Sequence, residues 1–134
     1  MAETHTDKRP LSPHLQIYRP MLTMMMSIVH RITGSALYFG IVFFVWWLIA
    51  GAISADYFAM TQAVFGHWLS KIVLFGFTWA LLHHMLGGLR HLVWDTGHGF
   101  KLPTVEFMAR ANVVLSIVLT LALWIGVYFT RGTL

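Results

Sequence analysis

The sequence predicts an all-α membrane protein with three transmembrane helices. Of its 134 residues, 57% are hydrophobic and only 10% are charged, whereas soluble domains carry about 25% charged residues. A chain this short has too little interior to bury so much apolar side chain in water. It also lacks cysteine, which excludes disulfides, thiolate metal sites and cysteine nucleophiles. The composition therefore argues against a water-soluble enzyme, and equally against a disordered chain.

Three long stretches without a charged residue supply the predicted helices. Residues 32–55, 72–89 and 111–130 contain 24, 18 and 20 residues. At 1.5 Å per residue each crosses, or nearly crosses, a hydrocarbon core of about 30 Å. Lys71 and Arg90 bound the shortest stretch, and their long stems reach back to the interface. Strands of a membrane barrel are excluded because they are about ten residues long and alternate in polarity.

With the flanking residues included, we expect helices at about 26–54, 65–92 and 108–131, within a single membrane-anchor domain of residues 1–134. Residues 1–25 form the predicted cytoplasmic arm. This arm is polar and has prolines at positions 10, 13 and 20, which resist helix. It lacks the apolar centre of a secretory signal, and its acidic residues argue against an organelle transit peptide. We expect it to be extended and to pack on a partner.

Lysine and arginine are unevenly distributed between the two sides of the predicted membrane protein. The N-terminal segment and the loop around residues 90–110 hold seven of them: Lys8, Arg9, Arg19, Arg31, Arg90, Lys101 and Arg110. The opposite side holds only Lys71 and Arg131. Positive charge is retained on the cytoplasmic side, so we expect a cytoplasmic N-terminus and an outward C-terminus. The net charge of +4 then reports topology, and we expect no nucleic-acid partner.

A first polar cluster lies at the cytoplasmic end of the first helix, in the string SIVHRITG. Ser27, Arg31 and Gly34 fall within about 60° of one another on a helix, and His30 lies on the flank of that face. Arginine at a helix end is commonly an interfacial anchor. Here it shares a face with a serine, so the pair can also donate hydrogen bonds. Either a haem propionate or a quinone carbonyl would accept them, and composition does not choose between these acceptors.

A second cluster lies at the cytoplasmic end of the second helix, in the string HHMLGGLRHLVWD. His84, Gly88, His91 and Asp95 are spaced 4, 3 and 4 residues apart, which keeps them on one face. His84 lies six residues before Arg90, about 9 Å inside the hydrocarbon, where ionisable residues are rare and usually functional. One interpretation is a neutral imidazole that binds a neighbouring helix. The other is an axial haem ligand.

The glycines and the remaining histidines leave these alternatives open. Gly87 and Gly88 would let a flat macrocycle lie against the helix, but small residues equally favour close helix–helix packing. His83 points about 100° away from His84 and is predicted to pack. Four histidines lie outside the spans and are expected to do no redox chemistry: His5, His14, His67 and His98.

These motifs, together with RPLSPHLQIY in the arm, resemble the cytochrome b subunit of succinate dehydrogenase, the larger membrane anchor of respiratory complex II. The arm is similar to the alphaproteobacterial and mitochondrial branch, and the absence of a transit peptide favours a bacterial inner-membrane protein. The resemblance implies that His84 is one axial ligand of a haem b, one per complex, whose second ligand comes from a smaller anchor subunit. It places His30 and Arg31 near the haem propionates, and His91 and Gly88 beside the haem.

The resemblance also implies a quinone site. Ser27 and Arg31 would line the pocket for ubiquinone, and Asp95 would sit on a path that delivers protons to it. In this family succinate is oxidised on a flavoprotein subunit, and electrons pass through an iron–sulfur subunit to ubiquinone, linking the tricarboxylic acid cycle to electron transport. The chain would dock both soluble subunits in the membrane. It has no succinate site or flavin motif of its own.

Two other functions remain open. A haem-free anchor would only tether soluble subunits, although His84 on a glycine-bearing face argues against it. A proton-conducting subunit would use His84, His91 and Asp95 as a relay, which requires polar residues to continue to the outer surface. The sequence offers only scattered ones there: Gly76, Thr78, Ser116 and Thr120.

Overall fold

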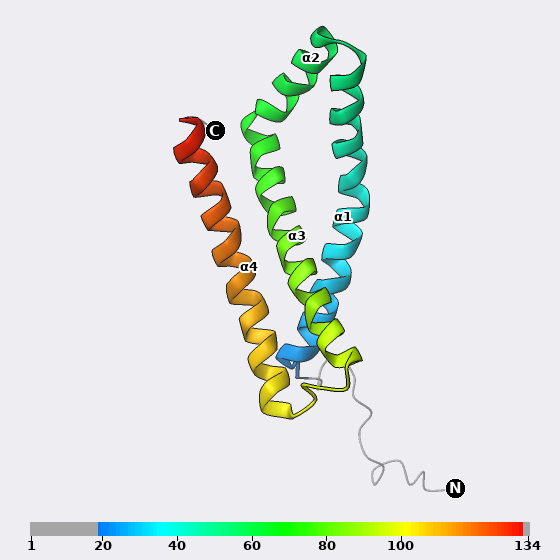
Figure 1. The fold of residues 1–134 in the computed structure, drawn as a ribbon, viewed down its shortest axis with the longest axis vertical. Helices are drawn as coiled ribbons and strands as arrows, with labels where there is room; N and C mark the ends of the chain where they lie inside the picture. The colour runs from blue at the N-terminus through cyan, green and yellow to red at the C-terminus, as the bar shows by residue number, and fades with distance from the viewer. Residues whose placement is uncertain (1–18, 133–134) are drawn as a thin grey trace, which may run out of the picture.

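Four helices form the part of the chain that the computed structural model describes, residues 19–132. They are α1 (Leu22–Ile53), α2 (Ala55–Gly66), α3 (Trp68–Asp95) and α4 (Leu102–Arg131), and no strand occurs among these residues (Figure 1). α1, α3 and α4 are long and apolar enough to cross a membrane. The prediction of an all-α protein with three transmembrane helices is confirmed. The RPLSPHLQIY segment, with the rest of residues 1–18, lies outside the described residues.

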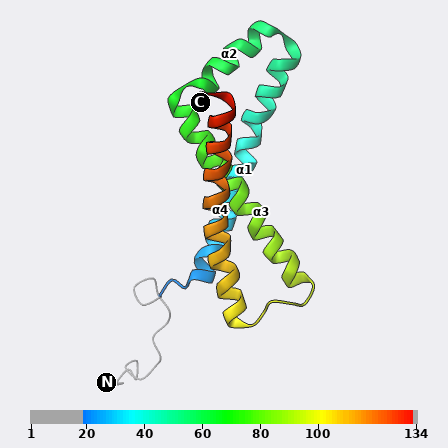
Figure 2. The ribbon, with the colours of Figure 1, turned by 60° about the vertical axis from the view of Figure 1, so that its left-hand side comes forward.

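α3 is the central helix of the bundle. It packs against α4 on one side and against α1 on the other. α1 and α3 cross, then separate toward the end where α2 joins them (Figures 1 and 2). One end of the molecule therefore holds the start of α1, the end of α3 and the loop before α4, and the opposite end holds α2 and the end of α4 (Figure 1).

α2 is a helix that the sequence analysis did not predict, because it lies outside the long apolar stretches. Its start is set by Ser54, whose hydroxyl accepts a hydrogen bond from the backbone N–H of Tyr57 at 3.1 Å, as N-cap serines do. Two tryptophans of α1 hold α2 in place. Trp46 Nε1 donates to the Tyr57 hydroxyl at 2.8 Å, and Trp47 Nε1 donates to Gln62 Oε1 at 3.2 Å.

The helix boundaries differ from those expected because charges and caps, as well as the membrane, set where a helix begins. α1 begins four residues early, directly after Met21 in extended conformation. α4 begins six residues early, with Pro103 in its first turn, where a missing N–H costs nothing. Its extra turns include an i,i+4 ion pair between Arg110 and Glu106 at 3.1 Å. α3 is shifted by three residues because His67 caps its start.

The interior is small and rich in polar residues, while the outside is apolar. Thr61, Ser116 and Thr120 are completely or almost completely buried. Large side chains such as Tyr38 and Phe129 are 74% and 78% exposed. This distribution suits a chain surrounded by lipid and partner helices, because membrane helices associate through small and polar contacts rather than through a hydrophobic core.

Candidate functional site

Two histidines from different helices stack where α1 crosses α3. The ring centroids of His30 and His84 are 4.0 Å apart, and the rings are inclined by only 4°. Glycines on the facing helices make room for each ring. A Cβ atom at Gly34 would lie 2.8 Å from Cε1 of His84, and one at Gly87 would lie 2.5 Å from Nδ1 of His30. Gly87 therefore serves close helix packing, one of the two roles expected of these glycines.

The hydrogen bonds of His84 fix which ring nitrogen carries the proton. Its Nδ1 lies 3.1 Å from the backbone carbonyl oxygen of His30 and 3.4 Å from Oγ1 of Thr33. A carbonyl oxygen can only accept a hydrogen bond, so Nδ1 is the protonated nitrogen and donates. The lone pair of Nε2 is then unshared, and no residue between 19 and 132 forms a hydrogen bond with it. Metal-ligating histidines are held in the same way.

His30 has a polar atom that the described residues leave unsatisfied. Its Nδ1 is buried and has no hydrogen-bond partner among them. The ring of His91 lies 5.4 Å from that of His30, measured between centroids, and is exposed at the end of the bundle. The structure thus brings His30, His84 and His91 together. Among the described residues, no group of three or more histidines and acids is arranged as a site for a bare metal ion.

Gly88 and Asp95 lie on the same helix as His84 and have open surroundings. A Cβ atom at Gly88 would meet nothing within 4 Å, so this glycine is not used for packing within the described chain. Asp95 is the last residue of α3 and is exposed. No hydrogen bond or ion pair joins its carboxylate to another described residue. Both positions are free to meet a ligand, water or a partner chain.

Ser27 and Arg31 are one turn apart on α1 and are exposed. Neither side chain forms a hydrogen bond or ion pair with another residue of the described range. The structure therefore separates them from the histidine stack: His30 turns toward α3, whereas Ser27 and Arg31 lie on surface that α3 leaves uncovered. Two donors side by side on an exposed helix face can bind a carbonyl or carboxylate oxygen.

A polar seam between α3 and α4 was missed by the sequence analysis. The amide nitrogen of Asn112 lies 3.2 Å from His83 Nδ1, and Ser116 Oγ lies 3.4 Å from the same nitrogen. His83 is 1% exposed, in agreement with its predicted packing role. Asn112, the only amide side chain in α4, was the available signal.

Arg90 is also placed differently from expectation. The residue is only 6% exposed, whereas the sequence predicts a long side chain that reaches back to the membrane–water interface. Its guanidinium carbon lies 5.0 Å from the ring centre of Trp94, and the aromatic face stabilises the cation within the bundle.

The fold and this arrangement define a multi-pass helical membrane protein with a histidine cluster near one end of its spans. Residues 5–123 match the family model described as the succinate dehydrogenase/fumarate reductase transmembrane subunit. The succinate dehydrogenase cytochrome b556 subunit of Paracoccus denitrificans is 45% identical over 119 residues, covering 89% of this chain and 92% of that protein. The Rickettsia typhi protein of the same name is 41% identical, covering 89% and 93%. The cytochrome b560 subunit of Sus scrofa mitochondria is 35% identical, covering 86% and 69%.

The chain therefore belongs to the family of succinate dehydrogenase and fumarate reductase transmembrane subunits. The resemblance to the cytochrome b anchor of succinate dehydrogenase is confirmed. So are the predictions of a multi-pass protein of the bacterial inner membrane and of a non-catalytic anchor in an oxidoreductase complex.

Proposed function

We propose that this chain binds haem b, with His84 supplying one axial ligand and a second anchor subunit supplying the other. The observation that supports this most strongly is the state of the His84 ring. Its Nδ1 is tied to the carbonyl of His30 at 3.1 Å, which leaves the lone pair of Nε2 for the iron. A name shared by the relatives, cytochrome b556 subunit, is consistent with a haem of this type.

Other residues of the site fit the remaining parts of a haem. The exposed guanidinium of Arg31 is a donor suited to a propionate, and we assign His30 to the same neighbourhood because its ring stacks on that of His84. Gly88 presents no side chain to the macrocycle, and His91 would lie beside it. When bound, haem b supplies a one-electron redox centre inside the membrane. The role of this chain would be to hold the haem, to orient His84 and to neutralise the propionates.

We further propose that Ser27 and Arg31 bind ubiquinone at the same end of the molecule. The hydroxyl and the guanidinium would donate hydrogen bonds to quinone carbonyl oxygens, which become more basic as electrons arrive. Reduction to ubiquinol consumes two electrons and two protons. Asp95, exposed at the end of α3, would pass protons to the quinone as a general acid that water reprotonates.

The partners of the chain follow from this arrangement. The histidines, Ser27, Arg31 and Asp95 share the end that holds the loop before α4, so the iron–sulfur subunit, which carries the electrons, would dock there together with the flavoprotein subunit. Arg19 and Lys101 also lie at this end, whereas Lys71 and Arg131 lie at the other. The positive-inside rule then makes the docking end cytoplasmic.

The haem proposal is tested by the haem content of the purified four-subunit complex, expressed per mole of protein. We expect His84→Leu to remove or strongly reduce bound haem, while the exposed loop variant His98→Leu keeps the wild-type content. A His84→Leu complex with full haem content would refute the assignment. A wild-type complex without haem would leave a membrane tether, the haem-free alternative.

The quinone site has its own test. Ser27→Ala and Arg31→Leu should lower succinate-dependent ubiquinone reduction at least about tenfold, because each removes a hydrogen bond made to a developing charge. Succinate oxidation with a water-soluble artificial acceptor should stay unchanged. Equal losses in both assays would show that the substitutions damage assembly instead.

A further inference from the structure

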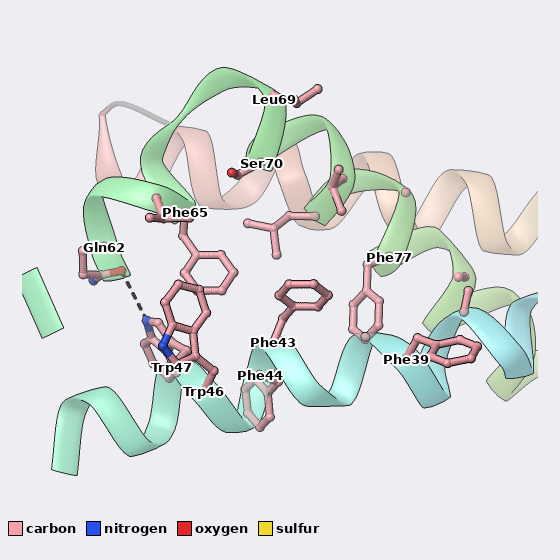
Figure 3. Close-up of a pocket in the computed structure, with 17 residues that line it drawn as sticks. Phe39, Phe43, Phe44, Trp46, Trp47, Gln62, Phe65, Leu69, Ser70 and Phe77 are labelled. Carbon is pink, nitrogen blue, oxygen red and sulfur yellow. Dashed lines mark hydrogen bonds between the residues drawn. The ribbon is translucent and has the colours of Figure 1, made fainter. Parts of the chain in front are cut away.

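A large cavity lies in the half of the molecule away from the histidines. It occupies about 810 Å³ between α1, α2 and α3, within the range of ligand pockets of roughly 300–1,000 Å³. Seven of the residues that line it are aromatic, among them Phe43, Phe65 and Phe77, whose rings face the space in Figure 3. The hydrophobic pattern of the sequence does not predict this cavity, and neither the proposed haem site nor the proposed quinone site includes it.

The cavity is closed at both ends along the membrane normal. On the inner side the cavity ends beyond Ala36 and Ala80, where α1 and α3 meet so closely that a Cβ atom at Gly34 would lie 2.8 Å from Cε1 of His84. On the outer side α2 spans the gap, held by the hydrogen bonds from Trp46 and Trp47 (Figure 3). A transmembrane helix of a partner subunit cannot pass through a space that is closed in this way. An occupant has to enter sideways, from the bilayer.

The lining has the chemistry of a site for a hydrocarbon chain. It includes no charged residue, and its polar side chains, apart from the tryptophans, are Gln62 and Ser70. Gln62 already accepts a hydrogen bond from Trp47, and the Nε1 of Trp46 is used by Tyr57. The walls therefore offer ring faces and methyl groups with few free donors. Water would find few hydrogen-bond partners in such a space, and apolar cavities of this kind stay dry.

We propose that this cavity binds the acyl chain of a membrane phospholipid. The isoprenoid tail of a quinone held by Ser27 and Arg31 is disfavoured by geometry. Seven residues of α1 line the cavity, and at 100° per residue five of them lie about 120° or more around the helix from Arg31. A tail that began at Arg31 would have to wrap around α1 to reach most of this wall. The acyl chain fills the wedge between α1 and α3 and holds the two helices at their crossing angle.

Two glycines provide a matched pair of variants. Gly76 lines the cavity, and a Cβ atom there meets nothing within 4 Å. Gly126 lies on α4, is exposed, and is equally free of contacts. Gly76→Phe therefore fills the cavity, whereas Gly126→Phe adds the same ring to a lipid-facing surface. Ala36→Phe is a second filling variant, on the α1 wall.

The test is native mass spectrometry of the four-subunit complex after exchange into lipid-free detergent, with lipid extraction to identify the bound mass. We expect wild type and Gly126→Phe to retain a phospholipid that both filling variants lose, with occupancy falling at least fivefold and haem content unchanged. Three results would overturn the proposal: a wild-type complex without phospholipid, filling variants that retain as much as Gly126→Phe, or a retained mass that is a quinone. If the Gly76→Phe complex does not assemble, the phospholipid retained by Ala36→Phe is compared with that retained by the wild type, and the same outcomes apply.

Discussion

The hydrogen bond from His84 Nδ1 to the backbone carbonyl of His30 links the crossing of α1 and α3 to the chemistry of the site. It joins α3 to α1 and, because a carbonyl only accepts, it selects the tautomer whose Nε2 can bind iron. Gly34 leaves room for this hydrogen bond to form, because a side chain at position 34 would press against the imidazole of His84. The same contact therefore packs α1 against α3 and leaves Nε2 of His84 available as a ligand.

Gly88→Leu tests whether the open face beside His84 receives the macrocycle. A Cβ atom at this position meets nothing within 4 Å in the described chain, so we expect the four-subunit complex to assemble. A haem lying against Gly88 would be displaced, and haem content should fall several-fold. Gly126→Leu, equally uncrowded, is the control. Full haem content and an unchanged spectrum in Gly88→Leu would contradict the placement.

Asp95→Asn tests the proton path. General acid–base groups contribute about 10²–10⁴-fold to rates, so ubiquinone reduction should slow at least about tenfold while artificial-acceptor activity is kept. Glu106→Gln removes another exposed carboxylate from the start of α4 and should have no effect. The two activities are measured on the same preparation. Matching rates for Asp95→Asn and wild type would remove Asp95 from the path.

Between helices, polar contacts rather than an apolar core hold α3 to α4. Asn112 and Ser116 both approach His83 Nδ1, and Trp124 Nε1 donates to Thr78 Oγ1 at 3.3 Å. Interhelical hydrogen bonds in membranes contribute about 0.5–2 kcal/mol each. This seam lies on a different face of α3 from His84, so we expect substitutions in it to change stability without changing the proposed haem site.

Asn112→Leu should therefore lower the thermal midpoint of the complex in detergent, by the loss of about 0.5–2 kcal/mol. The haem spectrum below that midpoint should match wild type. Val118→Leu, on the exposed face of α4, should change neither quantity. An altered haem spectrum in Asn112→Leu would show that α4 packing controls the site after all.

The sequence predicted these helices better than their contacts. Long apolar stretches define spans because the bilayer sets their length, and 4, 3, 4 spacing places His84 and Asp95 on one face. Which helix that face meets depends on the other helices, so the stacking on His30 and the burial of Arg90 were not predictable. α2 was missed because its capping signal at Ser54 is local and weak beside the hydrophobic pattern.

Within residues 19–132, more lysine and arginine residues lie at the histidine end of the molecule than at the α2 end. By the positive-inside rule this charge asymmetry determines the orientation of the chain in the membrane. Alkaline phosphatase, which folds only outside the cytoplasm, should be active when fused after residue 132 and inactive when inserted in the loop of residues 96–101. A green fluorescent protein should give the reverse pattern. The opposite result would place the proposed quinone site on the outer face.

The proposed ligation of haem iron by His84 is tested by the reduced-minus-oxidised optical spectrum of the purified complex. Wild type and His98→Leu should show the same low-spin b-type difference bands. His84→Leu should lose those bands, or show the spectrum of a high-spin haem that has lost one axial ligand. Identical low-spin bands in His84→Leu and wild type would contradict the account, because the iron would then take its ligands elsewhere.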